Sequence, residues 1–141
     1  MQFVCDAPDG TTWFRIETEL EAARESELMS HAVEKHYRRA QDAAAQSYEP
    51  GPVPFIEQDI GRAGHIRRTM PRFLTLRDEN GTALVTAMLP PAGGGDPEFR
   101  PIVVGPGNAD PYPEHAEAIA ALGRHVGLTL DRARCYPYRR G

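Results

Sequence analysis

A basic cluster in the middle of the chain contains the residue types best suited to binding chemistry. Between positions 62 and 77 the sequence places six basic or titratable side chains: Arg62, His65, Arg67, Arg68, Arg72 and Arg77. Guanidinium groups bind phosphates and carboxylates through paired hydrogen bonds, so this cluster predicts an anion-binding site. The residues assigned to that site are Arg62, His65, Arg67, Arg68 and Arg72.

The ligand of this predicted site is a small anion, a nucleic acid or an acidic protein face. The whole chain carries a net charge of −4 and has a pI of about 5.7. A dedicated nucleic-acid binder has a basic footprint, so nucleic acid is the less favoured ligand. The structural alternative is internal pairing, in which these arginines face the acidic first turns of a helix that begins at Thr18.

Metal binding is not predicted by the positions of the five histidines. His31 and His36 are five residues apart, which turns their side chains about 140° from each other on a helix. The chain has no His-Glu-x-x-His motif. Cys5 and Cys135 stand near opposite ends of the chain and do not have metal-ligand spacing. We therefore expect neither a metal nor a cofactor.

Nucleophilic catalysis also lacks a recognisable motif. The sequence contains no Gly-x-Ser-x-Gly, and its serines fall within or at the end of one expected helix: Ser26, Ser30 and Ser47. We therefore assign no catalytic residue. Catalytic groups need not be neighbours in sequence, so a small enzyme with dispersed residues is kept as a third hypothesis.

One long helix is expected over residues 18–46, and it organises the rest of the chain. Thr18 and Glu21 form a capping box, in which each side chain bonds to the other residue's backbone N–H. A helix of this length is about 42 Å long, more than a compact domain of this size needs. Its small residues favour contact with a partner, and the predicted partner-binding residues are Val33, Tyr37, Ala40 and Ala44.

The other segments read as short strands and shorter helices. Turn residues at 7–10 and at Asn80-Gly81 predict two β-hairpins, over 2–17 and 73–89. A helical stripe interrupted by glycines predicts a short irregular helix over 55–70. A strand over 99–104, a helix over about 113–126 and a strand over 128–130 follow, with a right-handed crossover if the two strands are parallel.

These elements predict a single α+β domain over residues 1–141, with a soft boundary at 48–54 and a loose tail over 131–141. We expect short antiparallel hairpins and a small mixed sheet packed on one long helix (about 18–46) and a shorter C-terminal helix (about 113–126). No apolar run is long enough to cross a membrane, and no signal peptide is recognised, so a cytoplasmic protein is expected.

The function expected from these patterns is a non-enzymatic interaction or accessory module. It would form a homodimer or bind a protein partner through the long helix. The second hypothesis is an anion- or nucleic-acid-binding protein that uses the Arg-rich segment 62–77. Neither hypothesis involves a membrane.

Overall fold

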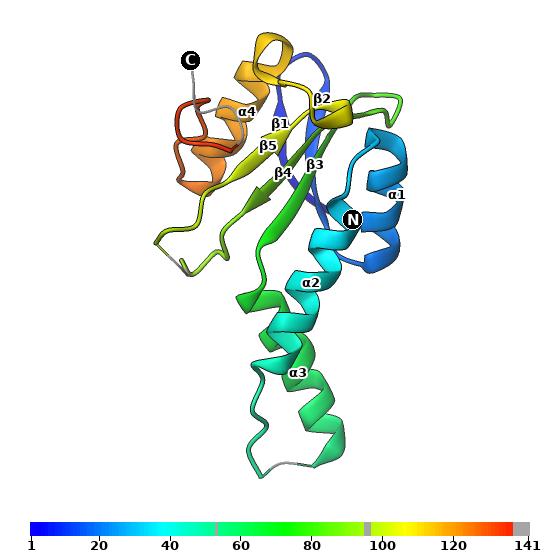
Figure 1. The fold of residues 1–141 in the computed structure, drawn as a ribbon, viewed down its shortest axis with the longest axis vertical. Helices are drawn as coiled ribbons and strands as arrows, with labels where there is room; N and C mark the ends of the chain where they lie inside the picture. The colour runs from blue at the N-terminus through cyan, green and yellow to red at the C-terminus, as the bar shows by residue number, and fades with distance from the viewer. Residues whose placement is uncertain (53, 95–96, 137–141) are drawn as a thin grey trace.

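An antiparallel sheet forms the centre of the computed structural model, which describes residues 1–52, 54–94 and 97–136 (Figure 1). Within these residues the sheet has five strands in the order β1-β2-β3-β4-β5. The strands are β1 (Gln2–Ala7), β2 (Thr11–Ile16), β3 (Arg72–Arg77), β4 (Ala83–Leu89) and β5 (Ile102–Val104). The helices are α1 (Glu19–Met29), α2 (Val33–Gln46), α3 (Phe55–Thr69), the short 3-10 helix η1 (Pro106–Asn108) and α4 (Tyr112–Val126). The predicted α+β class is confirmed.

Both predicted hairpins are present, and local turn chemistry explains each of them. Asp9 and Gly10 have positive φ angles of 60° and 72°, the conformation that a tight turn between β1 and β2 requires. The Asp78 carboxylate accepts hydrogen bonds from the backbone N–H groups of Asn80 and Thr82, both at 2.9 Å, in the turn between β3 and β4. These turns fix the register of the strands that they join.

The predicted continuous helix over 18–46 is wrong, because the chain turns between α1 and α2. Ser30 adopts a left-handed conformation (φ 53°, ψ 50°) that ends α1. The Ser26 hydroxyl accepts a hydrogen bond from the backbone N–H of Glu34 at 2.8 Å and so caps the first turn of α2. Serine side chains that bond to nearby backbone groups compete with helix continuation, and here they let α2 leave in a new direction.

The predicted start of this region is confirmed in part. Thr18 is the N-cap of α1, and its hydroxyl accepts a hydrogen bond from the Glu21 N–H at 3.1 Å. The Glu21 carboxylate accepts its bond from the backbone N–H of Glu17, at 2.8 Å, instead of from Thr18. Both bonds therefore stabilise the start of the helix, but the donor to the Glu21 carboxylate is Glu17, one residue before the one predicted.

The C-terminal helix ends as predicted, but the strand expected after it does not form. Gly127 is left-handed (φ 75°), and the Leu128 N–H donates to the Gly123 carbonyl at 2.9 Å, which is a Schellman ending. Leu130 is buried against α4, because Gly123 has no side chain to keep the returning segment away. The outer edge of β5 is bridged instead by Tyr136. That isolated bridge is parallel, whereas every pairing among the five strands is antiparallel, so the sheet of five strands is not mixed.

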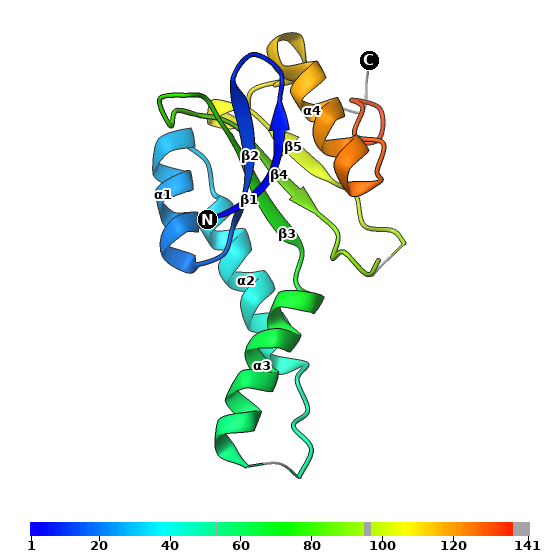
Figure 2. The ribbon, with the colours of Figure 1, turned by 180° about the vertical axis from the view of Figure 1, so that it is seen from behind.

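The helices cover the two faces of the sheet with separate apolar clusters (Figure 2). On one face α4 packs on Trp13, Leu74 and Leu76 through Ile119 and Leu122. On the other face residues of α1 and α2 pack on β2, β3 and the end of α3 in the second cluster: Ile16, Ala22, Val33, Tyr37, Ala44, Met70 and Phe73. Strand residues alternate between the two faces, so one sheet supports both clusters.

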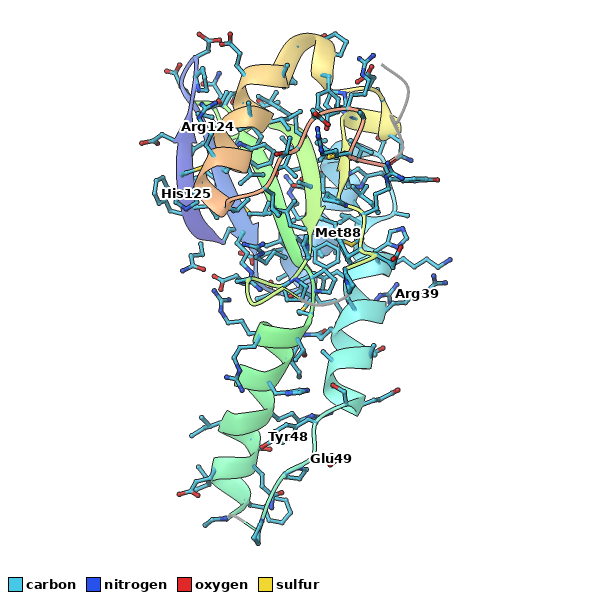
Figure 3. The ribbon with its side chains drawn as sticks, turned by 90° about the vertical axis from the view of Figure 1, so that its left-hand side faces the viewer. Arg39, Tyr48, Glu49, Met88, Arg124 and His125 are labelled. Atoms are coloured by element: carbon cyan, nitrogen blue, oxygen red, sulfur yellow. The ribbon has the colours of Figure 1, made fainter. Side chains whose placement is uncertain are left out.

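Two helices extend beyond the sheet. α2 and α3 lie side by side and project away from the strands, and Tyr48 and Glu49 mark the segment that joins them (Figures 1 and 3). The helix predicted over 55–70 is confirmed as α3, and none of its described residues is buried. We call residues 40–52 and 54–69 the arm. Its position leaves one side of α3 in solvent.

Candidate functional site

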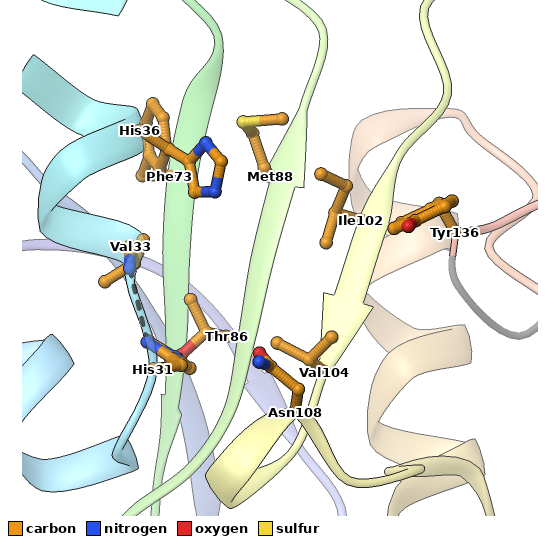
Figure 4. A pocket seen from close by; sticks show the side chains of 10 residues that line it. All are labelled: His31, Val33, His36, Phe73, Thr86, Met88, Ile102, Val104, Asn108 and Tyr136. Carbon is orange, nitrogen blue, oxygen red and sulfur yellow. Dashed lines mark hydrogen bonds between the residues drawn. The ribbon is translucent and has the colours of Figure 1, made fainter. Parts of the chain in front are cut away.

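A groove on the α1–α2 face of the sheet is a candidate site with an apolar floor and a polar rim (Figure 4). Its cavity volume of about 420 Å³ lies in the range of small-molecule sites. The described residues that line it are His31, Val33, His36, Phe73, Thr86, Met88, Ile102, Val104, Asn108 and Tyr136. We call this cavity the sheet groove.

The register of β3, β4 and β5 creates the apolar floor of the sheet groove. Phe73 pairs with Met88, which in turn pairs with Ile102, so one row of apolar side chains crosses three strands. Thr86 and Val104 pair two residues further along and lie on the same face. The start of α2 forms one wall and the segment that follows β5 lies opposite (Figure 4).

A chain of buried polar groups lies beneath one end of the groove. Glu25 of α1 is fully buried, and one of its carboxylate oxygens accepts a hydrogen bond from the Arg77 guanidinium at 2.7 Å. The other oxygen accepts a bond from the Thr86 hydroxyl at 2.5 Å. Because the Thr86 hydroxyl has only one proton, its oxygen accepts from His31 Nε2, which is 2.9 Å away.

These hydrogen bonds determine which ring nitrogen of His31 carries the proton. The ring carries its proton on Nε2, and its Nδ1 accepts the backbone N–H of Val33 at 3.4 Å. Burial lowers the pKa of His31 from its ordinary value of 6.5, and the nearby Glu25 charge opposes this shift only in part. A second ring proton would point at the Val33 N–H, which is also a donor. His31 is thus held neutral as a link between the α1–α2 turn and β4.

We expect acid to destabilise the fold through His31. The unfolded chain takes up a proton at His31 at a higher pH than the folded chain does, so the free energy of unfolding falls as the pH drops below 6.5. Above that value this contribution to stability is fully present. Urea titrations of the wild type and of His31→Gln between about pH 8 and about pH 5.5 measure it. An unchanged pH dependence in His31→Gln would contradict the assignment.

The rim of the sheet groove carries hydrogen-bonding side chains from separate parts of the chain. His36 of α2 points its imidazole ring across the floor towards Met88 (Figure 4). Asn108 at the end of η1 has a positive φ of 61°, a conformation that asparagine tolerates better than most residues, and its amide points into the groove. Tyr136 lies at the opposite rim beside Ile102.

The sheet groove was not predicted from the sequence, and the helix break explains why. His31 and His36 were placed on one helix, where they diverge by about 140°. In the structure His31 lies in the turn before α2, so both rings reach the same cavity. The signals that could have located the turn are Ser26 and Ser30, whose side chains favour a helix boundary.

The predicted anion-binding cluster is divided among several internal contacts. Arg67 forms an ion pair with Glu17 and donates a hydrogen bond to the Gln2 side chain at 2.6 Å. Arg72 donates to the Pro90 carbonyl at 2.8 Å, and burial lowers its pKa from the ordinary value. These two arginines are held by the chain's own acceptors, as Arg77 is by Glu25.

The other members of that cluster lie on the arm. His65 Nε2 is 2.7 Å from the Ser47 hydroxyl, a contact that joins α3 to the end of α2. Arg62 and Arg68 are exposed, and neither forms an ion pair within the described residues. Among the five side chains only Arg62 and Arg68 lack an ion pair or hydrogen bond to another described residue's side chain or backbone in these contacts, and anion binding by Arg62, His65, Arg67, Arg68 and Arg72 stays a prediction.

The residues of the predicted partner-binding face of α2 pack within the chain, and partner contact through them stays a prediction. Val33, Tyr37 and Ala44 are each less than 10 % exposed, and Ala40 packs beside them on the chain's own core. Tyr37 meets the Phe73 ring edge-on at a centroid distance of 5.2 Å. Because α2 lies against the sheet and α3, its apolar stripe is covered within the chain.

The exposed apolar surface lies on α3 instead. Phe55 is 84 % exposed, Ile56 75 % and Ile60 69 %. A group of large, highly exposed apolar side chains marks an interaction surface more often than a single exposed leucine does. The arm is therefore a second candidate site, separate from the sheet groove.

Two further searches concern the described residues only. No three of their His, Cys, Asp or Glu side chains are grouped so that they could hold a metal ion. None of their helices combines the length and the apolar character that a membrane span requires.

Comparison of the chain with protein-family models, curated proteins and solved structures finds no match. The functional argument therefore depends on the arm and the sheet groove themselves.

Proposed function

We propose that this protein is a non-enzymatic, self-associating interaction module, in which α3 of one copy pairs with α3 of a second copy in antiparallel orientation. The observation that carries the proposal is the exposed stripe of α3 on a projecting arm. Ile56, Ile60 and Ala63 follow the spacing i, i+4 and i+7, which puts them on one side of the helix. This stripe replaces α2 as the expected contact surface.

Charge along α3 favours a second copy as the occupant. The first half of the helix carries Glu57 and Asp59, whereas the second half carries Arg62 and Arg68 in addition to Arg67, which pairs with Glu17. A two-fold axis across two copies of one helix aligns them in opposite directions. The acidic half of each helix then faces the basic half of the other, which complements charge without a different partner.

Glu57 and Arg68 make this complementarity specific. They are eleven residues apart, so their side chains lie about 20° from each other on the same flank of the helix. Both are exposed, and neither forms an ion pair within the described part of the chain. In an antiparallel pair, Glu57 of one copy would lie opposite Arg68 of the other, in the manner of the flanking charges of a coiled coil.

Small residues in the second half of α3 permit close approach of two helices. Ala63 is exposed, and a Cβ added at Gly64 would contact only the flexible end of the Arg68 side chain. Ile60 of one copy can therefore pack close to Ala63 of the other copy. The helix is about 22 Å long, enough for two heptads of contact.

The test is the oligomeric state of Ile60→Glu. We expect the wild type to show a concentration-dependent dimer in sedimentation velocity, and Ile60→Glu to weaken dimerisation at least about tenfold, because a buried unpaired carboxylate opposes association. The matched control is Leu20→Glu, since Leu20 is 81 % exposed and belongs to α1, outside the stripe of α3. A wild type that stays monomeric at high concentration, or equal effects of the two variants, would overturn the proposal.

Charge reversal tests the antiparallel orientation. Glu57→Arg and Arg68→Glu should each weaken the dimer, because each places like charges opposite one another. The double variant restores opposite charges and should regain most of the lost affinity. Two single effects that simply add in the double variant would contradict the antiparallel arrangement.

A further inference from the structure

We propose that the sheet groove binds a small, electrically neutral molecule that has a flat apolar body and hydrogen-bonding groups at its edge. This inference goes beyond self-association, because none of the stripe residues of α3 lines the groove. It rests on the shape of the floor, the charge of the walls and the position of the polar rim.

The floor sets the shape of the ligand. Phe73, Met88 and Ile102 form a row across three adjacent strands, and neighbouring strands lie about 4.8 Å apart. The floor is therefore about 10 Å across, and its side chains project from one face of a sheet. One or two fused rings match this width, and a cavity volume of about 420 Å³ accommodates such a molecule.

The lining sets the charge of the ligand. No Arg, Lys, Asp or Glu is among the described residues that line the cavity. Glu25, which accepts the Thr86 hydroxyl beneath the groove, is paired with Arg77. A charged ligand in the groove would lose hydration without gaining an opposite charge, which costs binding free energy. The site therefore favours neutral over anionic molecules.

The rim supplies hydrogen bonds at the edge of the ligand. His36 stands on the α2 wall, Asn108 at the η1 end and Tyr136 on the opposite side (Figure 4). Asn108 keeps its amide directed into the groove from a left-handed backbone position that most residues avoid. A few polar groups around an apolar floor are typical of sites that fix the orientation of a small molecule.

Two fluorescent probes that differ in a single group test the inference. N-phenyl-1-naphthylamine is neutral, has a flat naphthalene ring and one N–H donor, whereas 8-anilinonaphthalene-1-sulfonate is the same ring system with an added sulfonate. The titrations use the Ile60→Glu variant, in which the added carboxylate interrupts the apolar stripe of the arm. We expect saturable binding of one neutral probe per chain, and binding of the sulfonate at least about tenfold weaker.

A variant that fills the groove locates the binding. His36 is exposed on α2, so His36→Trp should leave the fold intact while its larger ring occupies the cavity. We expect it to weaken binding of the neutral probe at least about tenfold. Lys35→Trp, on the same helical turn but outside the groove, is the matched control and should bind as its parent does.

Further measurements test whether the tryptophan variants keep the parent fold and where the probe binds. Circular dichroism and thermal melting of both tryptophan variants should match the parent, and the neutral probe should shift the NMR amide signals of Thr86, Val104 and Asn108. Absence of saturable binding, equal affinity for both probes, or identical behaviour of His36→Trp and Lys35→Trp would each overturn the proposal.

Discussion

Replacing Arg77 by methionine is expected to lower the free energy of unfolding by about 3–5 kcal/mol. Glu25 is fully buried, and Arg77 is the only cation that forms an ion pair with it within the described residues. The guanidinium also donates to the Thr75 hydroxyl at 3.0 Å and to the Gly81 carbonyl at 3.3 Å. Removing it leaves a carboxylate in the interior without an opposite charge. Urea denaturation followed by circular dichroism measures the loss.

The double variant Glu25→Gln/Arg77→Met separates the buried charge from the packing. A neutral amide at position 25 still accepts the Thr86 hydroxyl, so we expect the double variant to recover more than half of the loss seen in Arg77→Met. Arg24→Met is the matched control. Arg24 and Glu27 form an exposed pair, and exposed pairs contribute no more than about 1 kcal/mol. A double variant as unstable as the single one would refute this account.

Trp13→Ala is expected to have an effect of similar size, about 3–5 kcal/mol, on the opposite face of the sheet. Trp13 is fully buried, and its indole N–H donates to the Ala118 carbonyl at 2.9 Å, so one side chain ties β2 to α4. Truncation removes the largest buried side chain and leaves a cavity beneath the helix. Chemical denaturation must be followed by circular dichroism, because the chain has one tryptophan.

Trp13→Phe distinguishes the hydrogen bond from the volume. Phenylalanine keeps most of the apolar contact but has no N–H donor, so the loss should be smaller, about 1–2 kcal/mol. The Ala118 carbonyl loses the indole donor in this variant. Equal losses for Trp13→Ala and Trp13→Phe would show that the Ala118 contact, and not packing, dominates at this position.

The two expected effects concern the two faces of one sheet, and their consequences for the proposed sites differ. Arg77 lies beneath the sheet groove, where Thr86 belongs both to the buried network and to the cavity lining. Trp13 lies on the α4 face, away from the groove and the arm. Loss of Trp13 should therefore weaken the fold as a whole, whereas loss of Arg77 should also disturb the groove.

Local features of this chain follow from residues that are close in sequence. The turn at Asn80-Gly81, the Thr18 cap and the Gly127 ending each depend on contacts within five residues, so the sequence alone predicts them. The same holds for the α+β class, which follows from alternating and helical apolar patterns. The helix break at Ser30 also depends on local hydrogen bonds. The sequence prediction missed it, because most residues of 18–46 have high helix propensity and this was given more weight than Ser26 and Ser30.

The candidate sites depend on contacts that no local pattern contains. Arg77 pairs with Glu25 across 52 positions, and His31 meets Thr86 across 55. The sheet groove exists because the strand register aligns Phe73 with residues of β4 and β5 while α2 covers only part of that face. The sequence by itself determined the turns, the caps and the amphipathic segments, since their free energies are set by near neighbours. Tertiary packing alone decided which stripe is buried on α2 and which stays exposed on α3, because that depends on where whole elements come to rest against one another.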